Sequence, residues 1–583
     1  MSPLDAARAF AAEDPDPDTQ RELLQLIARV EAGDTAALAD LADRFAAPLD
    51  FGTAGLRGRV EAGLARMNRV VVMRASWGLG RWLLEHPELE PARRGVVIGF
   101  DGRYSSRQFA EDTAAVLAGL GIPAHIFSDP VSTPFCAFTL THLRAAAGVM
   151  VTASHNPPLD NGYKVYAANG AQIIPPADHE IAAWIARAPR IGELARPTPH
   201  AAAAAALRHS IDDSVELAYL EGLAQNAWRP RSPVPLNIVY TAMHGVGHRA
   251  LVRALRRAGF DGIAVVPSQC DPDGAFRTVA FPNPEEKGAM DRALGLARET
   301  GAELVLANDP DADRLAVAVP DGSAYRMLTG NEIGFLLAED ALQHADSGGR
   351  KKLVITTIVS SSLLSRMAKN LGAAYAETLT GFKWIANAAI RSQAEGLAFV
   401  FGYEEALGYS CGTLVRDKDG IGAALRMAEL ARELKSHGQS LLGRLDALLV
   451  AHGLSHQVQW SVTLAGAEGK AKIEGAMAAL RNAPPRTLNQ SPVERSLDLA
   501  SRQERLADGT TRPLELPSSN VLMFHGRDGG RLIVRPSGTE PKIKFYLELV
   551  GSASSTAEVP RVRAALDARC AEVKKELMAP LAL

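Results

Sequence analysis

The chain has 583 residues, of which 47% are apolar and 22% charged, and its formal net charge is −3. Such a composition is typical of a globular protein, and at roughly 150 residues per domain the length predicts about four domains. The negative balance argues against a general nucleic-acid binder, which needs a basic surface, so any anionic ligand must be met by local basic groups.

The spacing of the cysteines and the hydropathy of the chain indicate the cellular compartment in which we expect the protein. The four cysteines lie far apart without a CxxC pair, so neither a disulfide framework nor a zinc site is expected. Residues 1–14 lack the pattern of a signal peptide, and no apolar run approaches the roughly 18 residues that span a bilayer. We therefore expect a cytoplasmic protein without a membrane partner.

The first 50 residues are expected to form a helical arm with a packing role. Thr19 and Glu22 match a T-x-x-E capping box at the start of a helix. Its apolar face is predicted to consist of Leu23, Leu24, Leu26, Ile27 and Val30. The segment FGTAGLRG at 51–58 follows as a glycine-rich loop, whose backbone amides and Arg57 suit a phosphate; a plain turn is the alternative.

Strands and helices then alternate in three similar units. The predicted strands are 95–100, 124–127, 145–151, 236–240, 262–266, 303–307, 315–319, 353–358 and 397–401. This alternation predicts three mixed or parallel α/β domains. From about residue 456 the apolar pattern becomes alternating, as in 458–464 and 532–534, which predicts a C-terminal α+β domain with an antiparallel sheet.

These patterns divide the chain into five segments. The Pro- and Ala-rich stretch 184–206 is interpreted as a connection between two domains. The expected segments are an arm over 1–50, α/β domains over 51–205, 206–320 and 321–455, and an α+β domain over 456–583.

Ser154 lies in the segment TASHNP, residues 152–157, directly after the apolar run 145–151. An apolar run that ends at Ser, Asn and Pro indicates a buried strand that leads into a loop, where a serine hydroxyl can act as a nucleophile. A turn or capping role is the alternative, because such side chains often bond nearby backbone groups.

Asp309, Asp311 and Asp313 alternate along the segment NDPDADR, residues 308–314. Three neighbouring carboxylates repel one another unless a cation neutralises them, and an all-oxygen set suits Mg²⁺ or Mn²⁺. A calcium loop of the EF-hand type is excluded, because its sixth position would be Arg314 and its twelfth Pro320. A solvated acidic turn is the remaining alternative.

The segment RPSGTEPK at 535–542 combines a guanidinium, two hydroxyls and a glycine within eight residues. Several donors that converge without a metal suit a terminal phosphate dianion. A strand-to-turn connection with a charged rim is the alternative.

Taken together, these segments resemble the motifs of the α-D-phosphohexomutase superfamily. TASHNP, NDPDADR, RPSGTEPK and GYEEALGY at 402–409 occur in the order of that superfamily, and FGTAGLRG and TGFKW at 380–384 also fit. The chain is most similar to the phosphoglucomutase branch with GYEE and TGFKW signatures. The resemblance covers almost the whole chain and implies four domains arranged around a central cleft.

The resemblance implies roles for individual residues. Ser154 is implied to carry a phosphoryl group and, with Asp309, Asp311 and Asp313, to hold Mg²⁺. The residues implied to line the transferring group or to move protons are Arg57, His155, Lys164, Arg314 and Lys418. The residues implied to bind the rest of a phosphosugar are Thr380, Gly381, Lys383, Glu404, Arg535, Ser537, Gly538 and Thr539.

The reaction implied by the resemblance interconverts glucose 1-phosphate and glucose 6-phosphate through a phosphoserine enzyme and glucose 1,6-bisphosphate. Ala406 stands where many glucose-type members have a serine, so mannose and pentose phosphates remain open as substrates. A metal-dependent sugar phosphatase and a non-catalytic phosphosugar sensor are the alternatives from other classes. A serine esterase is disfavoured, since no GxSxG elbow surrounds Ser154.

Overall fold

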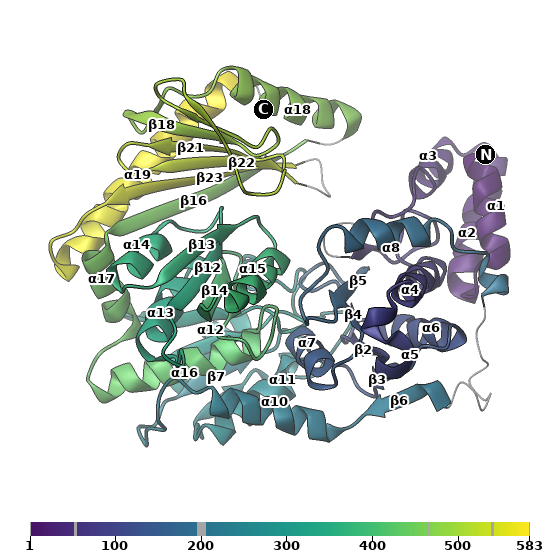
Figure 1. Cartoon of the computed structure of the whole chain (residues 1–583), viewed down its shortest axis with the longest axis horizontal. Helices are drawn as coiled ribbons and strands as arrows, with labels where there is room; N and C mark the ends of the chain where they lie inside the picture. Colours follow the sequence, from purple (N-terminus) through teal and green to yellow (C-terminus); the bar gives the residue numbers. More distant parts are fainter. Residues whose placement is uncertain (1, 52–54, 195–205, 465, 538–541, 582–583) are drawn as a thin grey trace.

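The computed structural model describes residues 2–51, 55–194, 206–464, 466–537 and 542–581. A helical arm precedes four domains, which we number by their sheets (Figure 1). The first three sheets are mixed or parallel and the fourth is antiparallel, so the predicted fold class is confirmed. Among the described residues, no helix has the length and apolar character needed to cross a membrane.

The arm consists of α1 (Pro3–Glu13), α2 (Pro17–Glu31) and α3 (Thr35–Arg44), and lies at one end of the molecule beside the first domain (Figure 1). Leu23, Leu26 and Ile27 are buried, and the cluster they belong to includes Val70 and Met73 of the first domain. The arm therefore packs on the first domain, a partner that the sequence analysis did not name.

Two details of α2 differ from the prediction. The helix begins at Pro17 and is capped by Asp16, while the Thr19 hydroxyl donates to Asp14 at 2.6 Å, so the Thr19 capping box is wrong. Proline suits a first helical position and an aspartate caps well, which moves the start one turn earlier. Leu24, predicted on the buried face, is 52% exposed.

The first sheet has the order β1-β5-β4-β2-β3-β6, with β1 and β5 antiparallel to their neighbours. Its strands are β1 (Leu56–Arg59), β2 (Val96–Phe100), β3 (Ala124–Phe127), β4 (Ala147–Val151), β5 (Asp160–Ala167) and β6 (Arg208–Ile211). Its helices are α4 (Arg69–Leu84), α5 (Pro91–Arg94), α6 (Ser106–Gly119), α7 (Thr133–His142) and α8 (Ala177–Ile185).

Two sequence predictions for this domain change. Three of the eight residues of the predicted glycine-rich loop, Leu56, Arg57 and Gly58, belong to strand β1, because their backbone pairs with β5, and residues 52–54 of that loop lie outside the described residues. Strand β6 pairs with β3, so the expected boundary after residue 205 separates a strand from its sheet. A sheet edge can recruit a short exposed strand that carries no apolar pattern of its own.

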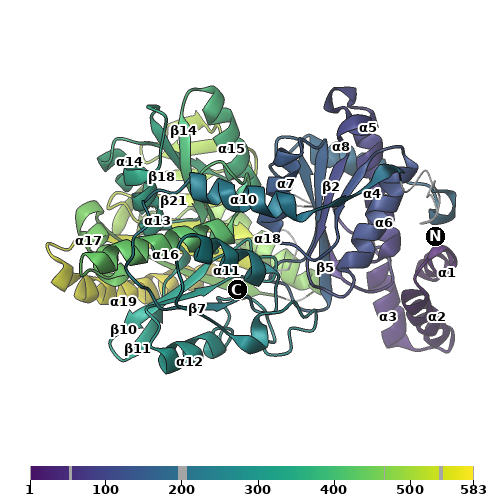
Figure 2. The ribbon, with the colours of Figure 1, turned by 90° about the horizontal axis from the view of Figure 1, so that it is seen from below.

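The second sheet has the order β11-β10-β9-β7-β8. Its strands are β7 (Ile238–Thr241), β8 (Ile263–Val265), β9 (Leu304–Ala307), β10 (Ala316–Asp321) and β11 (Ala324–Met327), and its helices are α11 (Gly247–Arg257) and α12 (Asp291–Thr300). Because β10 and β11 form a hairpin, the expected boundary after residue 320 cuts through this sheet. Helix α10 (Asp213–Gln225) contacts α7 of the first domain and α11 of the second (Figure 2).

The third sheet has the order β13-β12-β14-β15. Its strands are β12 (Lys352–Thr357), β13 (Ala374–Thr378), β14 (Ala398–Glu404) and β15 (Gly408–Ser410). Its helices are α13 (Gly330–His344), α14 (Leu363–Asn370), α15 (Phe382–Ala394), α16 (Gly420–Ser436) and α17 (Leu441–His452). Helix α13 begins with a complete capping box between Thr329 and Glu332, which stabilises its first turn.

The fourth sheet is antiparallel, with β16 and β23 as its longest strands, and lies next to the third domain, at the top of the view (Figure 1). Its strands are β16 (Leu454–Thr463), β18 (Ser491–Asp498), β19 (Gln503–Leu506), β20 (Thr511–Pro513), β21 (Leu522–Gly526), β22 (Arg531–Pro536) and β23 (Lys542–Gly551), and β17 (Thr487–Leu488) pairs with β18. Helices α18 (Gly466–Asn482) and α19 (Val559–Met578) contact this sheet.

Candidate active site

Ser154 follows β4 in a tight turn, with its side chain only 3% exposed. Its φ of 51° lies in the left-handed region, which non-glycine residues rarely adopt and which indicates a fixed turn. The Ser154 amide donates to Thr152 Oγ1 at 2.8 Å, and the Thr152 hydroxyl donates to Asp101 Oδ2 at 2.7 Å. The turn is therefore anchored to the end of the neighbouring strand β2.

The Arg103 side chain stabilises the same turn through hydrogen bonds to its backbone. Its guanidinium donates to the carbonyl oxygens of Ser154, Asn156 and Pro157, each at 2.7 Å, and to that of Asp160 at 2.9 Å. The Arg103 side chain is buried, and its Nε lies 3.2 Å from Asp101 Oδ2. One side chain thus binds four backbone carbonyls of the loop that follows Ser154.

The three predicted carboxylates lie together and face Ser154. Asp309, Asp311 and Asp313 follow β9 and are fully buried, and one oxygen of each lies within 4.8 Å of the others. The Ser154 hydroxyl donates to Asp309 Oδ2 at 2.7 Å. Although the serine and the aspartates are over 150 residues apart in the chain, the fold brings them into direct contact.

Lysine side chains compensate the negative charge of this cluster. Lys164 Nζ lies 2.7 Å from Asp311 Oδ2 and 3.0 Å from Asp313 Oδ2, and Lys418 Nζ lies 3.1 Å from Asp313 Oδ2. Burial raises the pKa of Asp311, but the Lys164 ammonium, the Thr133 hydroxyl and the charge of Lys418 together more than offset this effect and hold the pKa below its ordinary value. Burial and the two neighbouring carboxylates raise the pKa of Asp309.

The carboxylates also fit a divalent cation. Asp311 Oδ1 and Asp313 Oδ1 are buried and accept no hydrogen bond from any residue that the structure describes. Buried carboxylate oxygens are costly without a partner, and hard oxygen ligands are those that Mg²⁺ prefers. Asp309, Asp311, Asp313 and the Ser154 side chain would hold the ion.

Arg314, His155 and Arg57 also contact Ser154 or its immediate neighbours. Arg314 Nε lies 3.8 Å from Asp309 Oδ2, and its Nη1 donates to the Ala406 carbonyl at 3.0 Å. Burial, with the positive charges of Arg314 and Arg57, lowers the pKa of His155 well below its ordinary value, so its imidazole is neutral. Arg57 Nη1 donates to Asn156 Oδ1 at 3.3 Å.

The third domain contributes the GYEEALGY segment. Glu404 Oε1 accepts a hydrogen bond from the Gly381 amide at 2.7 Å, which joins two of the predicted sugar-binding segments. A Cβ at Gly408 would lie 2.4 Å from Lys418 Cδ, so this glycine leaves room for the Lys418 side chain beside Glu404.

Two side chains of the TGFKW segment stay without hydrogen bonds. Thr380 Oγ1 and Lys383 Nζ are buried, and neither has a hydrogen-bond partner among the described residues. Burial lowers the pKa of Lys383 to about 8, although the charge of Asp178 in the first domain opposes that shift. Buried donors of this kind are typical of a binding site that awaits a polar ligand.

The fourth domain carries the predicted phosphate segment. Arg535 lies in β22, and the Ser537 amide donates to the Lys542 carbonyl at 2.6 Å. The positive charge of Arg535 acts on Glu405, whose pKa is nevertheless raised by burial. Gly538 and Thr539 lie outside the described residues.

Sequence reasoning assigned no role to Asp101, Arg103 or Thr133. The Thr133 hydroxyl donates to Asp311 Oδ2 at 2.6 Å, and its amide donates to the Asp311 carbonyl at 2.9 Å. The sequence gives a weak indication of a role for Asp101 and Arg103, since both follow the predicted strand 95–100, which the structure pairs with β4. It gives no such indication for Thr133, because its partner lies 178 residues away.

Comparison with known protein families agrees with this geometry. Models of the phosphoglucomutase/phosphomannomutase family match all four domains: the three alpha/beta/alpha domains over 48–190, 217–322 and 329–448, and the C-terminal domain over 488–567. Together they match more than half of the chain.

Three relatives illustrate the range of names among similar proteins. A probable phosphomannomutase of Haemophilus influenzae is 41% identical over 86% of this chain and 96% of its own length. A phosphopentomutase of Mus musculus is 37% identical over 92% of this chain and 88% of its own length. A phosphoglucomutase of Staphylococcus aureus is 35% identical over 87% of this chain and 90% of its own length.

Solved structures share the fold at low identity. A phosphoglucomutase/phosphomannomutase family protein of Burkholderia thailandensis aligns with a TM-score of 0.63 and 17% identity over 90% of this chain and 97% of its own. The open form of the Paramecium phosphoglucomutase parafusin aligns with a TM-score of 0.60 and 18% identity over 89% and 95%. The chain belongs to the phosphoglucomutase/phosphomannomutase family of the α-D-phosphohexomutase superfamily and is a phosphosugar mutase.

Proposed function

We propose that the protein interconverts glucose 1-phosphate and glucose 6-phosphate through a phosphorylated Ser154 and glucose 1,6-bisphosphate. The observation that carries this proposal is the contact between Ser154 Oγ and Asp309, 2.7 Å long, at a cluster of three buried carboxylates. A serine beside a divalent-cation site is suited to hold a phosphoryl group and to release it to another oxygen.

Mg²⁺, when bound by the aspartates and the phosphoserine, supplies positive charge that stabilises the transferring phosphoryl group. Arg57 and Arg314 would add guanidinium donors to the same group, since both lie beside the Ser154 loop. Lys164 is buried among carboxylates whose negative charge raises its pKa despite the opposing effect of burial. It therefore acts as a fixed cation in this arrangement.

The sugar hydroxyl that receives the phosphoryl group must lose a proton. His155 is the candidate base best suited to accept it, because its imidazole is neutral and its Nδ1 lies 3.5 Å from Ser154 Oγ. The negative charges of Asp313, Asp417 and Glu404 together raise the pKa of Lys418 against the effect of burial, so Lys418 suits proton donation better than acceptance.

The remaining predicted residues would orient the substrate. Glu404 would bind ring hydroxyls, with Thr380, Gly381 and Lys383 beside it, and Arg535 and Ser537, with Gly538 and Thr539, would hold the phosphate that does not react. The bisphosphate intermediate must turn over between the two transfers, so this clamp has to accept either phosphate. Donors that recognise charge more than sugar shape suit that requirement.

A pentose phosphate is the second candidate substrate. Ala406 presents a methyl group where a serine hydroxyl would bond a ring hydroxyl, and its carbonyl is used by Arg314. Relatives at 35–37% identity are named phosphopentomutase, phosphoribomutase and phosphoglucomutase. Mannose phosphate is the third candidate, since the relative at 41% identity is named a probable phosphomannomutase.

Ser154→Ala tests the phosphoserine route. We expect mass spectrometry of the wild-type protein to find phosphate on the peptide that contains Ser154, and the variant to lose at least about 10³-fold in kcat. Ser128→Ala, which changes a serine outside the active site, should keep wild-type activity. A Ser154→Ala variant with near wild-type turnover would refute the route.

The choice of sugar is tested by kcat/KM for glucose 1-phosphate, mannose 1-phosphate and ribose 1-phosphate, each primed with the matching bisphosphate and with Mg²⁺ present. We expect glucose 1-phosphate to give the highest kcat/KM. A higher kcat/KM for ribose 1-phosphate would show instead that a pentose phosphate is the substrate. Release of inorganic phosphate faster than isomer formation would instead indicate a sugar phosphatase.

A further inference from the structure

A cavity of about 650 Å³ is lined by several arginines, and none of its lining residues belongs to the candidate active site. Arg93, Arg94 and Arg144 belong to the first domain, and Arg416 belongs to the segment that follows β15 in the third domain. The cavity therefore lies where two domains meet. Nothing in the proposed mutase reaction uses these four side chains.

The cavity is strongly basic although the chain as a whole is slightly acidic. Its four guanidinium groups face a single carboxylate, that of Glu90, which pairs with Arg93. His125 also lines the cavity, and burial lowers its pKa, so its ring adds no charge at neutral pH. Over the whole chain, 63 Lys and Arg residues are outnumbered by 66 Asp and Glu residues, so the lining of this cavity is more basic than the average composition of the protein.

Three of the arginines form no ion pair with a carboxylate within 4.0 Å among the described residues, although the charge of Arg94 acts on Glu90 over a longer distance. Arg94 donates from Nε and Nη2 to the carbonyls of Arg144 and Ala145, and Arg416 Nη1 donates to the Asn169 carbonyl at 2.6 Å. The Arg144 guanidinium has no hydrogen bond or ion pair there. Because guanidiniums that no carboxylate neutralises bind phosphate groups well, the charge of the cavity is available to an anion.

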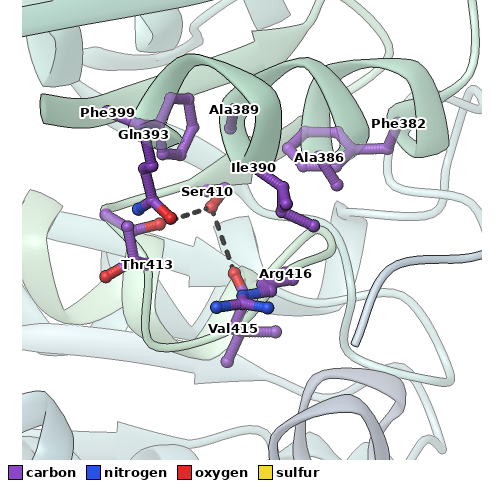
Figure 3. Close-up of a pocket in the computed structure, with 11 residues that line it drawn as sticks. Phe382, Ala386, Ala389, Ile390, Gln393, Phe399, Ser410, Thr413, Val415 and Arg416 are labelled. Carbon is purple, nitrogen blue, oxygen red and sulfur yellow. Dashed lines mark hydrogen bonds between the residues drawn. The ribbon is translucent and has the colours of Figure 1, made fainter. Parts of the chain in front are cut away.

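Figure 3 shows how the third domain presents Arg416. The Ser410 hydroxyl is placed to donate to the carbonyl of Gly412 at 3.1 Å or of Val415 at 3.4 Å, and these contacts close the loop that ends at Arg416. Figure 3 draws a small pocket of the third domain, which residues of α15 and of this loop line. Arg416 lines both this small pocket and the larger basic cavity. A closed loop holds the arginine in place and lowers the entropy cost of binding a ligand.

The same loop leads directly to the active site. Asp417 accepts hydrogen bonds from Tyr166 at 2.7 Å and from Gln172 at 2.8 Å, both in the first domain. Lys418, the next residue, lies 3.1 Å from Asp313. Three consecutive residues therefore connect the cavity, the contact between the first and third domains, and the metal-binding carboxylates.

We propose that this cavity is a regulatory site for a small, multiply phosphorylated anion, and that its occupation changes turnover through the segment 416–418. The anion would bind Arg93, Arg94 and Arg144 of the first domain together with Arg416 of the third. This bridge favours one relative position of the two domains and with it one position of Lys418.

Binding is tested with hexane-1,6-diol bisphosphate, which has two phosphates and no sugar ring, by calorimetry on the full chain with Mg²⁺. Since the proposed phosphate clamp at Arg535 can also take the probe, we expect two binding events in the wild type and one in Arg535→Gln. The double variant Arg93→Gln with Arg144→Gln should keep the clamp event and weaken the cavity event at least about tenfold.

A matched control removes two exposed arginines of the second domain, Arg256→Gln with Arg298→Gln, and should bind the probe as the wild type does. The site is refuted if the cavity double variant binds like the wild type, if Arg535→Gln abolishes all binding, or if the control weakens binding equally. Thermal unfolding of each variant separates lost binding from lost folding.

Coupling is tested by mutase assays with and without the probe. In the wild type the probe should change kcat at saturating substrate in addition to competing with substrate. In the double variant Arg93→Gln with Arg144→Gln only the competition should remain, and activity without the probe should be that of the wild type. The same inhibition pattern in both proteins would refute the coupling.

Discussion

The Arg103 guanidinium shows how much of the active site depends on one side chain that touches no reacting atom. It binds four carbonyls of the loop after Ser154, and the ring of Phe276 in the second domain lies 5.0 Å from it. A charged donor with several fixed acceptors stabilises an irregular loop better than separate neutral contacts do. Arg103 is therefore a positioning residue for Ser154.

Arg103→Met should destabilise this loop, because four buried carbonyls lose their donor and Asp101 loses its cation. We expect the free energy of opening of residues 152–163, measured by hydrogen exchange, to fall by about 3–5 kcal/mol. The exposed Arg107→Met should change it by less than about 0.5 kcal/mol. An unchanged opening free energy in Arg103→Met would show that the loop is held by other contacts.

Lys383 supplies a second prediction for a single residue. Its pKa of about 8 means that the ammonium is charged at neutral pH and loses its proton as the pH rises through 8. If this charge binds substrate, KM should rise by up to about tenfold between pH 7 and 9. Lys383→Arg should remove the rise of KM with pH, because the guanidinium keeps its charge, whereas the control Lys435→Arg should keep it. A wild-type KM that does not change between pH 7 and 9 would contradict a role of Lys383 in substrate binding.

Among secondary-structure elements, the contact between the third and fourth domains depends on a buried ion pair. Arg531 of β22 binds Glu548 of β23 at 2.5 Å, and Glu548 accepts hydrogen bonds from the Ser361 hydroxyl and the Ser362 amide before α14. The Ser362 amide precedes the first residue of α14, where a carboxylate is favourable. Neighbouring strands of one sheet thereby hold a helix of another domain.

Glu548→Gln should weaken this contact by up to about 3–5 kcal/mol, because the buried Arg531 keeps only Glu377, whose Oε1 lies 3.2 Å from its Nη1, as a counter-charge. Burial raises the pKa of Glu548, but the charge of Arg531 together with the hydrogen bonds from Ser361, Ser455 and Ser362 outweighs burial and keeps the pKa below its ordinary 4.5. The stabilisation is therefore complete above about pH 4.5 and disappears as the pH falls through the lowered pKa of the folded state.

Scanning calorimetry between pH 3 and 7 measures this effect as the temperature at which the fourth domain unfolds. The wild type should lose stability in acid more steeply than Glu548→Gln, while the exposed Glu494→Gln should behave like the wild type. Parallel curves for the wild type and Glu548→Gln would contradict the assignment.

At the scale of the whole molecule, the site joins three domains. Ser154 and Lys164 come from the first domain, the aspartates from the second, and Lys418 from the third. A cation bound there connects the domains, and binding to the folded state alone raises its stability. The temperature of unfolding should therefore rise with Mg²⁺ concentration, by the equivalent of about 2.7 kcal/mol at 100 times Kd.

Asp311→Asn should abolish the Mg²⁺-dependent part of this shift, because the ion loses one anionic ligand. Asp346→Asn, an exposed substitution, should keep it. The metal site would be excluded by a wild-type unfolding temperature that does not respond to Mg²⁺, or by the same response in Asp311→Asn.

The sequence by itself determined the fold class and many strands, because alternation and apolar runs are local properties of a chain. It also identified Ser154 and the aspartate trio as candidates, since each motif lies within a few residues. Some predictions from local sequence patterns were wrong. Helix α2 begins at Pro17 with Asp16 as its cap, and not at Thr19. Strands β6 and β11 pair with strands on the other side of the expected domain boundaries, because their partners are distant in the sequence or lie across a boundary.

Only the tertiary structure decided which groups meet. The contact of Ser154 with Asp309, the hydrogen bond from Thr133 to Asp311 and the arginine cavity all join residues more than 100 positions apart. Such pairings depend on how sheets and domains pack, and no local pattern of apolar or polar residues encodes them. The sequence thus contained the chemical groups of the site, while packing of the domains decided their geometry.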